Sequence, residues 1–178
     1  MRIAERFDMQ QILVEVILGY VVQCMACVLC VAGMAKRKLP MWQFLVSSIG
    51  FAVIAYVFRK FLAKNLNFGV HTIINMIILS GIGIVFLKLD IQPTILGSIF
   101  SMALIMGSEL ANVAFIVLLK QISFDEVSGF LASCGELQKT WYAVPGNIVI
   151  FLFTLAFYCL RIRAKKGEVN GKTGKAPV

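Results

Sequence analysis

A single carboxylic acid lies within the apolar stretch IMGSELANVAF, which spans residues 105–115. Glu109 is the only ionisable residue between Asp90 and Lys120. A charged side chain at the centre of a bilayer costs about 2.5–3.5 kcal/mol on insertion scales, so such a residue is usually paired or functional. We expect Glu109 to be protonated and hydrogen-bonded within the protein. Two roles are open: a hydrogen bond that fixes helix packing, or ligand contact with proton-linked gating.

Hydroxyl and amide side chains recur beside Glu109 at helical spacing, so they form a polar stripe along one helix. The stripe consists of Thr94, Ser98, Ser101, Ser108 and Asn112. Gln23 lies midway along an earlier apolar run, and His71, the only histidine, lies near the start of another. The candidate residues for ligand binding or coupling are therefore Glu109, Asn112, Ser108, Ser101, Gln23 and His71.

The sequence lacks the motifs of catalysis and of metal or cofactor binding. It has no nucleophile–base pair and no HExxH, P-loop or GxGxxG motif. Cys24, Cys27 and Cys30 have the spacing C-x-x-C-x-x-C, but an iron–sulfur cluster normally needs four thiolates. These three lie in an apolar run, where cysteine packs as a small hydrophobic residue. We expect no enzyme activity, no cofactor and no metal site.

The elements that must position these residues are apolar helices. The chain has 178 residues, of which 60% are hydrophobic and only 15% charged, whereas a soluble domain carries roughly 25% charged residues. Lipid leaves helices or closed barrels as spanning structures, and the runs are continuously apolar rather than alternating. We predict an all-α, polytopic transmembrane helical bundle in residues 1–166, with its fourth helix at the centre, and a disordered basic cytoplasmic tail in residues 167–178. The five expected spans cover about residues 12–34, 41–58, 68–87, 93–119 and 144–160.

Between the fourth and fifth spans, residues 123–141 have the pattern of an amphipathic helix. Ser123 and Glu126 have capping-box spacing, in which each side chain satisfies a free backbone N–H at a helix start. Apolar residues then recur at helical spacing as far as Trp141. This pattern predicts one interfacial helix at the outer membrane surface. A soluble lid packed on the bundle is the alternative.

The lysine and arginine residues flank the apolar runs. With five spans and a cytoplasmic C-terminus, ten of the 17 cations lie inside, which is the orientation that the positive-inside rule favours. We therefore expect a multi-pass protein of the cell membrane, with its N-terminus outside and its C-terminus cytoplasmic. The lipid bilayer is the partner of the basic tail. Nucleic acid is not an expected partner, because no globular domain is left to present a basic patch.

Several short segments recur in a familiar order along residues 41–158. They are Arg59 ending the second span, FGVHTI at residues 68–73, Lys88 and Leu89 after the third span, Glu109 within the fourth, and Pro145 opening the last. In these features the chain resembles the N-terminal membrane sensor region of Gram-positive sensor histidine kinases with GHKL-type ATPase domains, broadly like the accessory-gene-regulator peptide receptors. Those kinases continue into a phosphoacceptor helix and an ATPase domain, whereas this sequence has no N-box, ATP lid or cytoplasmic histidine. The resemblance implies a stand-alone sensor-like module.

The resulting expectation is a non-catalytic membrane sensor or regulatory module that binds an apolar or peptide signal and works with a separate kinase or ATPase subunit. One alternative is a small transporter, or the substrate-binding subunit of a vitamin-type importer. Another is a scaffold in which Glu109 only orders the packing. Ala103, Gly107 and Ala111 have the small-xxx-small spacing that permits a homodimer. Packing within one chain uses the same pattern.

Overall fold

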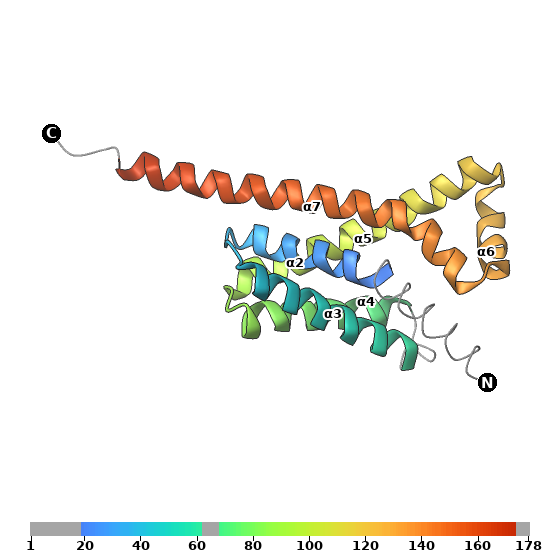
Figure 1. The fold of residues 1–178 in the computed structure, drawn as a ribbon, viewed down its shortest axis with the longest axis horizontal. Coiled ribbons are helices and arrows are strands. Elements are labelled where there is room, and N and C mark those ends of the chain that lie inside the picture. The colour runs from blue at the N-terminus through green and yellow to red at the C-terminus, as the bar shows by residue number, and fades with distance from the viewer. Residues whose placement is uncertain (1–18, 62–67, 174–178) are drawn as a thin grey trace.

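The computed structural model describes residues 19–61 and 68–173, and these form helices and short connections with no strand among them. The elements are, in order, α2 (Val22–Met34), α3 (Met41–Phe61), α4 (Phe68–Gly81), the π-helical segment η3 (Ile82–Phe86), α5 (Ile91–Lys120), α6 (Phe124–Ser133) and α7 (Glu136–Thr173). The long elements run alternately between the two ends of the bundle, and α6 lies across one end (Figure 1). The predicted all-α helical bundle is confirmed.

Helix α2 lies at the centre of the bundle. It packs against α3, α5 and α7, and every residue from Ala26 to Gly33 is buried. The prediction that the fourth apolar helix, now α5, is central is therefore wrong: Met106, Gly107 and Leu110 on its outer half are exposed. The physical reason is side-chain size, because alanine, cysteine and glycine on α2 let several helices approach it at once.

The closest approach of α5 to α2 occurs at Gly97. A Cβ atom at this position would lie 2.7 Å from Cα of Val31, so only glycine fits without a shift of the backbone. The Cys30 thiol lies 3.5 Å from the Gly97 carbonyl oxygen, to which it donates a weak hydrogen bond. By contrast, nothing lies within 4 Å of a Cβ placed on Gly107. The close contact of α5 inside the bundle is therefore made by Gly97, and not by the small residues Ala103, Gly107 and Ala111.

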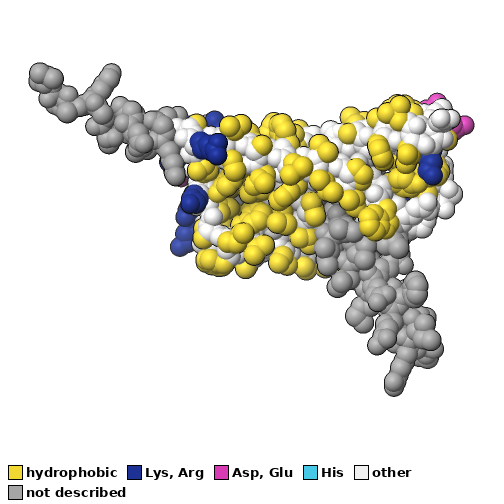
Figure 2. All heavy atoms as spheres, turned by 45° about the horizontal axis from the view of Figure 1, so that its top comes forward, with side chains coloured by type: hydrophobic (Ala, Val, Ile, Leu, Met, Phe, Trp, Pro, Cys, Tyr) yellow, Lys and Arg dark blue, Asp and Glu magenta, His cyan; other side chains and the backbone are white. Residues whose placement is uncertain are grey.

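One end of the bundle is rich in cations (Figure 2). We call it the basic end; its described cations are Lys36, Arg37, Lys38, Lys88, Arg161, Arg163 and Lys165. Nη1 of Arg37 donates to the carbonyls of Leu87 and Lys88, at 2.8 and 2.6 Å, and so joins the α2–α3 loop to the η3–α5 loop. The backbone N–H of Leu39 donates to the hydroxyl of Tyr158 on α7 at 3.1 Å. These bonds fix the loops of the basic end to one another.

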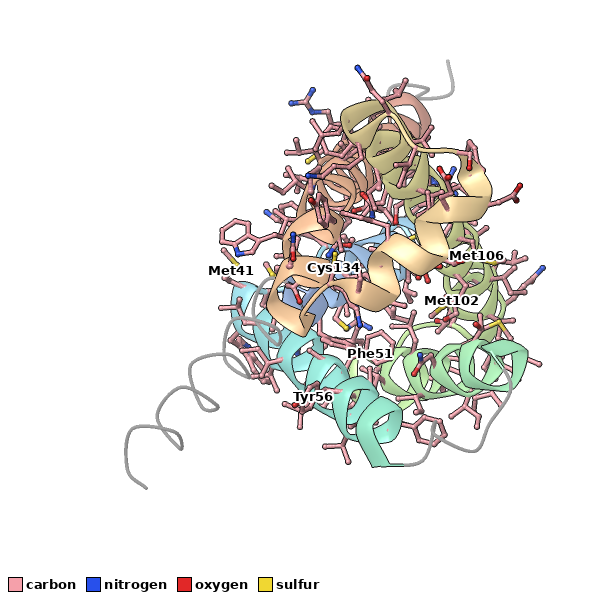
Figure 3. All side chains as sticks on the ribbon, turned by 90° about the vertical axis from the view of Figure 1, so that its right-hand side faces the viewer. Met41, Phe51, Tyr56, Met102, Met106 and Cys134 are labelled. Atoms are coloured by element: carbon pink, nitrogen blue, oxygen red, sulfur yellow. The ribbon has the colours of Figure 1, made fainter. Side chains whose placement is uncertain are left out.

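The opposite end differs from the prediction of one amphipathic helix over residues 123–141. Helix α6 ends at Ser133 and α7 begins at Glu136, so the segment is divided between two helices. Cys134 has an extended backbone (φ −78°, ψ 144°) and a buried side chain. Gly135 follows, and glycine costs about 1 kcal/mol in a helix interior. The break turns the second half of the segment back along the bundle (Figure 1). The end view in Figure 3 shows α6 lying across this end, with Cys134 labelled.

The last helix, α7, is longer at both ends than the predicted span of residues 144–160. The sequence predicts a start at residue 144, whereas Pro145 lies inside α7, nine residues after its first residue, Glu136. The sequence also predicts disorder from residue 167, whereas α7 continues to Thr173. Extending a formed helix avoids the cost of nucleation, which explains why a polar segment can continue it. Residues 174–178 of the predicted tail lie outside the described residues.

Large apolar side chains cover the flank of the bundle between its two ends (Figure 2). Val85, Leu110 and Leu118 are 77%, 67% and 79% exposed. Among the described residues, three helical stretches are long and apolar enough to cross a membrane: Met41–Phe58, Ile91–Lys120 and Gln138–Lys165. Two apolar helices, Gly19–Met34 and Thr72–Phe86, are shorter than the roughly 20 residues that a span needs. The chain therefore has the features of a membrane protein, while the count of five spans stays a prediction.

The α2–α5 contact gives a direct test of this packing. We expect Gly97→Ala to lower the free energy of unfolding by about 1–3 kcal/mol, because the added methyl group meets the backbone of Val31. The matched control Gly107→Ala should change it by less than about 1 kcal/mol, since the position is open. Denaturant unfolding in detergent micelles measures both values. Equal effects of the two variants would contradict the assignment of Gly97 to the helix contact.

Candidate functional site

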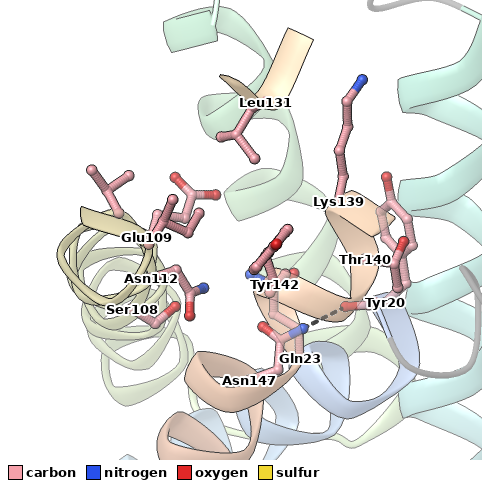
Figure 4. Close-up of a pocket in the computed structure, with 14 residues that line it drawn as sticks. Tyr20, Gln23, Ser108, Glu109, Asn112, Leu131, Lys139, Thr140, Tyr142 and Asn147 are labelled. Atoms are coloured by element: carbon pink, nitrogen blue, oxygen red, sulfur yellow. Dashed lines mark hydrogen bonds between the residues drawn. The ribbon is translucent and has the colours of Figure 1, made fainter. Parts of the chain in front are cut away.

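Helices α2, α5, α6 and α7 line a pocket of about 400 Å³, open on one side, at the end of the bundle opposite the basic end (Figure 4). Nine of its fourteen lining residues have polar side chains. The polar lining residues are Tyr20, Gln23, Ser108, Glu109, Asn112, Lys139, Thr140, Tyr142 and Asn147. Gly19, Val113, Ile116, Leu131 and Ala143 complete the wall. Such a lining can bind a ligand through hydrogen bonds and charge, not only through apolar contact.

Four of the six candidate residues meet in this pocket: Gln23 from α2, and Ser108, Glu109 and Asn112 from α5. Ser101 does not line it. That side chain is 2% exposed between the helices, and its hydroxyl donates to the Ser98 carbonyl at 2.8 Å. His71 lies in the first turn of α4, a helix that does not line the pocket, and its side chain lies outside the described ones.

Glu109 is exposed on the α5 wall of the pocket, and its carboxyl group points towards Leu131 of α6 (Figure 4). The expected burial of this residue within the bundle is therefore wrong. The cause is the central position of α2, which leaves the outer half of α5 at the periphery. The carboxyl group is instead placed to contact a molecule inside the pocket.

Asn112 joins α5 to the bend of α7. Its Oδ1 accepts a hydrogen bond from the backbone N–H of Gly146 at 3.0 Å. The preceding residue, Pro145, has no N–H, and its ring cannot be accommodated against the Trp141 carbonyl without bending the helix. A Cβ atom on Gly146 would overlap the Asn112 amide group. The bend therefore depends on a proline, a glycine and an asparagine acting together.

Asn147, the next residue of α7, makes the second polar contact of the pocket floor. Its side chain is 5% exposed, and Nδ2 donates to the Gly19 carbonyl at 3.2 Å, as the dashed line in Figure 4 shows. One asparagine thus links α7 to α5 and the other links α7 to α2. Interhelical hydrogen bonds in membrane proteins contribute about 0.6 kcal/mol each on average. Their main effect here is to set the spacing of the walls.

Helix α6 covers this end of the pocket and is held by an aromatic contact. The rings of Phe130 and Tyr142 meet edge to face with centroids 5.6 Å apart. The ammonium group of Lys120 lies 5.7 Å from the first ring centroid and 5.9 Å from the second, within the range of cation–π attraction. Because Tyr142 also lines the pocket, the residue that holds α6 is in reach of a bound ligand.

The start of α6 has the predicted capping box. The N–H of Ser123 donates to Oε2 of Glu126 at 2.8 Å. Hydrogen bonds from the backbone and then from the side chain of Ser123 lower the pKa of Glu126 below its ordinary value. The carboxylate is thus held in its charged form, which the positive end of the helix dipole also stabilises. The sequence identified this feature from spacing alone.

Several pocket residues were missed by the sequence analysis, chiefly those on the first turns of α7. Lys139 and Thr140 were assigned to an interfacial helix ending at Trp141, because the break at Gly135 was not recognised. Tyr142 fell between that helix and the last predicted span. Asn147 carried a signal that was not used: it is an amide within an apolar run, as Gln23 is. The proline–glycine pair just before it marks a bent helix, where side chains commonly satisfy the backbone.

Among the residues that the structure describes, no group of three or more His, Cys, Asp or Glu side chains is placed to hold a metal ion. Cys24, Cys27 and Cys30 are buried free thiols in α2. Their place at the centre of the helix contacts agrees with a packing role.

No protein-family model, curated protein or solved structure matches the chain. The site is therefore interpreted from its own geometry.

The bend of α7 predicts a non-additive pair of variants. Gly146→Ala is expected to destabilise the protein by about 1–3 kcal/mol, because the methyl group overlaps the Asn112 amide. Asn112→Ala should cost about 1–3 kcal/mol, because it leaves the Gly146 N–H without its partner. In the double variant the overlap is absent, so the loss should be smaller than the sum. Denaturant unfolding of all four proteins gives the coupling energy. Strict additivity would argue against this contact.

Proposed function

We propose that the chain is a stand-alone, non-catalytic membrane sensor or regulatory module whose signal binds in the pocket beneath α6. The observation that carries the proposal is the convergence of polar side chains from α2, α5 and α7 on one pocket. Its volume of about 400 Å³ falls within the roughly 300–1,000 Å³ typical of small-molecule sites. Polar groups grouped in this way in an otherwise apolar bundle are usually functional.

The proposed topology has five spanning helices, with the pocket outside and the basic end in the cytoplasm. Cations gather at one end of the bundle (Figure 2), and the positive-inside rule assigns such an end to the cytoplasmic face. The described part of α2 is short, but its centre faces other helices rather than lipid. A short α4 can be matched by local thinning of the bilayer. In this topology the N-terminus is outside, and a signal reaches the pocket without crossing the membrane.

The ligand classes expected from the sequence are an apolar molecule and a peptide, and the pocket favours the second. Gln23 and Thr140 offer an amide and a hydroxyl group, which are suited to peptide N–H and C=O groups. An apolar ligand would displace water from the polar lining without offering a hydrogen bond in return. The resemblance to the membrane regions of peptide receptors agrees with this choice.

Helix α7 is the proposed route from the pocket to the cytoplasm. Tyr142 and Asn147 lie at the pocket, and Arg161 lies at the basic end of the same helix. A ligand that contacts α6 and Tyr142 shifts α7 from one packing arrangement to another only if it binds the second arrangement more tightly than the first. The basic end would then present the altered surface to a separate kinase or ATPase subunit.

The alternative function, a small transporter or the substrate-binding subunit of a vitamin-type importer, uses the same pocket. It is favoured by the proline bend in α7 directly beside the pocket floor, because interrupted helices line substrate sites in many transporters. Uptake distinguishes the two. A sensor binds its ligand without accumulating it in proteoliposomes, whereas accumulation would favour the transporter.

Filling the pocket tests the proposed site. Ser108→Trp is expected to abolish the thermal stabilisation that a pool of short peptides gives the protein in nanodiscs, because the indole occupies the pocket. The matched control is Gly107→Trp, one residue away, where nothing lies within 4 Å of a Cβ atom and the side chain points out of the bundle. Stabilisation by the pool should persist in the control. Its persistence in both variants would mean that ligands bind elsewhere.

The orientation has its own test. A cysteine introduced by Ser128→Cys on α6 should react in intact cells with a membrane-impermeant maleimide. One introduced by Lys38→Cys at the basic end should react only after the cells are permeabilised. The labelling of each variant is compared with that of the parent protein. Among the described residues, the exposed thiol of the parent is Cys159. The opposite labelling pattern would reverse the topology.

A further inference from the structure

At the basic end, cations lie directly beside exposed aromatic side chains. Trp42 lies in the first turn of α3 and Phe86 is the last residue of η3, and their rings meet edge to face with centroids 6.2 Å apart. The two side chains are 59% and 41% exposed. Lys88, two residues after Phe86, is also exposed. In Figure 2 the cations of this end adjoin the apolar flank of the bundle. The surface therefore changes from charged to apolar within a few residues.

Arg37 holds a second cation at this surface. Its Nη1 donates to the carbonyls of Leu87 and Lys88, so the guanidinium group lies against the backbone of Lys88. These two bonds use the N–H groups of Nη1. Within the described part of the chain, Nε and Nη2 of Arg37 and the ammonium group of Lys88 have no acceptor. A guanidinium group presents its donors in a planar fork that matches the oxygens of a phosphate.

The backbone of Lys88 is an unusual place for a lysine. The residue follows the end of η3 in the left-handed conformation, with φ 52°. Glycine is the usual residue at such a position, because a Cβ atom is crowded there. The N–H of Leu89, the next residue, donates to the Gly83 carbonyl at 3.0 Å and so fixes the turn. Residues other than glycine in this conformation are concentrated at binding sites, where the side chain has a use.

We propose that this surface, formed by Arg37, Lys88, Trp42 and Phe86 and here called the lipid site, binds an anionic phospholipid. The phosphate of the headgroup accepts hydrogen bonds from the guanidinium and ammonium groups. An acyl chain of the same lipid lies along the exposed rings. The site is at the opposite end of the bundle from the pocket, so the inference does not rest on the function proposed for the pocket.

The combination of charge and apolar surface selects an amphiphilic anion. Inorganic phosphate or an acidic protein surface pairs with the cations but makes no use of the exposed rings. A zwitterionic phospholipid covers the rings but brings its own cation beside Arg37 and Lys88. An anionic phospholipid matches both parts, so discrimination comes from favourable and unfavourable contacts together. A tryptophan at the level of the headgroups is also a common membrane anchor.

The other charged groups of the basic end leave this assignment in place. Asp90 is the one acid among the described side chains there, and it precedes the first turn of α5, where the positive end of the helix dipole offsets its charge. On α7, Tyr158 contacts Leu39, whereas Lys165 lies about 10 Å further along the helix, which extends past the loops in Figure 1. The lipid site is thus separate from the basic tail, which attracts the bilayer by charge alone.

The tryptophan of the lipid site can report its occupancy. The chain has two tryptophans, so Trp141→Phe leaves Trp42 as the only one. This protein is placed in nanodiscs of phosphatidylcholine and phosphatidylglycerol, with one of the two lipids brominated near the headgroup end of its chains. Bromine quenches tryptophan fluorescence only at close range. Quenching against the mole fraction of each brominated lipid should give an apparent affinity about fivefold to thirtyfold higher for phosphatidylglycerol, as expected for one or two cations near a phosphate.

Matched variants of the single-tryptophan protein separate a site from a general effect of charge. Lys88→Gln should lower the preference for phosphatidylglycerol by about fivefold, and Lys88→Arg should keep it. Lys165→Gln removes the same charge from α7 and should leave the preference unchanged. In a second reporter, Trp42→Phe, the remaining Trp141 should show no effect of Lys88→Gln. The melting temperature of each variant shows that the fold is retained.

The expected result is a preference for phosphatidylglycerol at Trp42 that Lys88→Gln reduces and Lys165→Gln does not. Equal quenching by the two lipids overturns the proposal and leaves the basic end to an acidic protein partner. An equal loss in the two glutamine variants also overturns it, because diffuse charge then explains the preference. Millimolar inorganic phosphate should not displace the lipid. If it does, the cations act without the rings, and the amphiphilic ligand is wrong.

Discussion

The close packing around α2 is the constraint on which the rest of the structure depends. Its side chains are small enough for α5 and α7 to approach it closely. Gly97 of α5 lies against the backbone of Val31, and Gly33 of α2 lies against Phe157 and the backbone of Tyr158 on α7. In lipid there is little hydrophobic drive to bring helices together, so van der Waals contact of this kind carries the association. Each surrounding helix then has one face on α2 and another exposed.

The same arrangement explains where the pocket lies. Over residues 26–33 the neighbours of α2 are in full contact with it, whereas Gly19, Tyr20 and Gln23 are only half-buried. At that end the space between α5 and α7 is lined by their polar side chains and covered by α6. Asn112 and Asn147 keep α7 at a fixed distance from its two neighbours. The pocket is thus a consequence of close packing at one level of the bundle and of polar contacts at the next.

The polar stripe of α5 proves to have two different parts. Near the basic end its hydroxyl groups are buried and mostly bond to the backbone of their own helix: Thr94 donates to Asp90, and Ser98 to Thr94. Ser80 adds one bond between helices, to the hydroxyl of Ser98 at 2.9 Å. Beyond Ile105 the stripe lines the pocket instead. One sequence pattern therefore serves packing in the first half of the helix and a candidate binding site in the second.

Composition and periodicity by themselves determined the helical class, the apolar helices with their flanking cations, the capping box at Ser123 and the polar stripe beside Glu109. These features depend on neighbours in the sequence, for which spacing is sufficient. Only the tertiary structure decided that α2 is central, that Glu109 is exposed in a pocket, and that the segment before Pro145 breaks at Gly135 and brings Lys139 to that pocket. Those outcomes depend on which helix accepts the closest neighbours and on where a chain turns back. Both are set by contacts between residues far apart in the sequence, such as Val31 with Gly97 and Asn112 with Gly146.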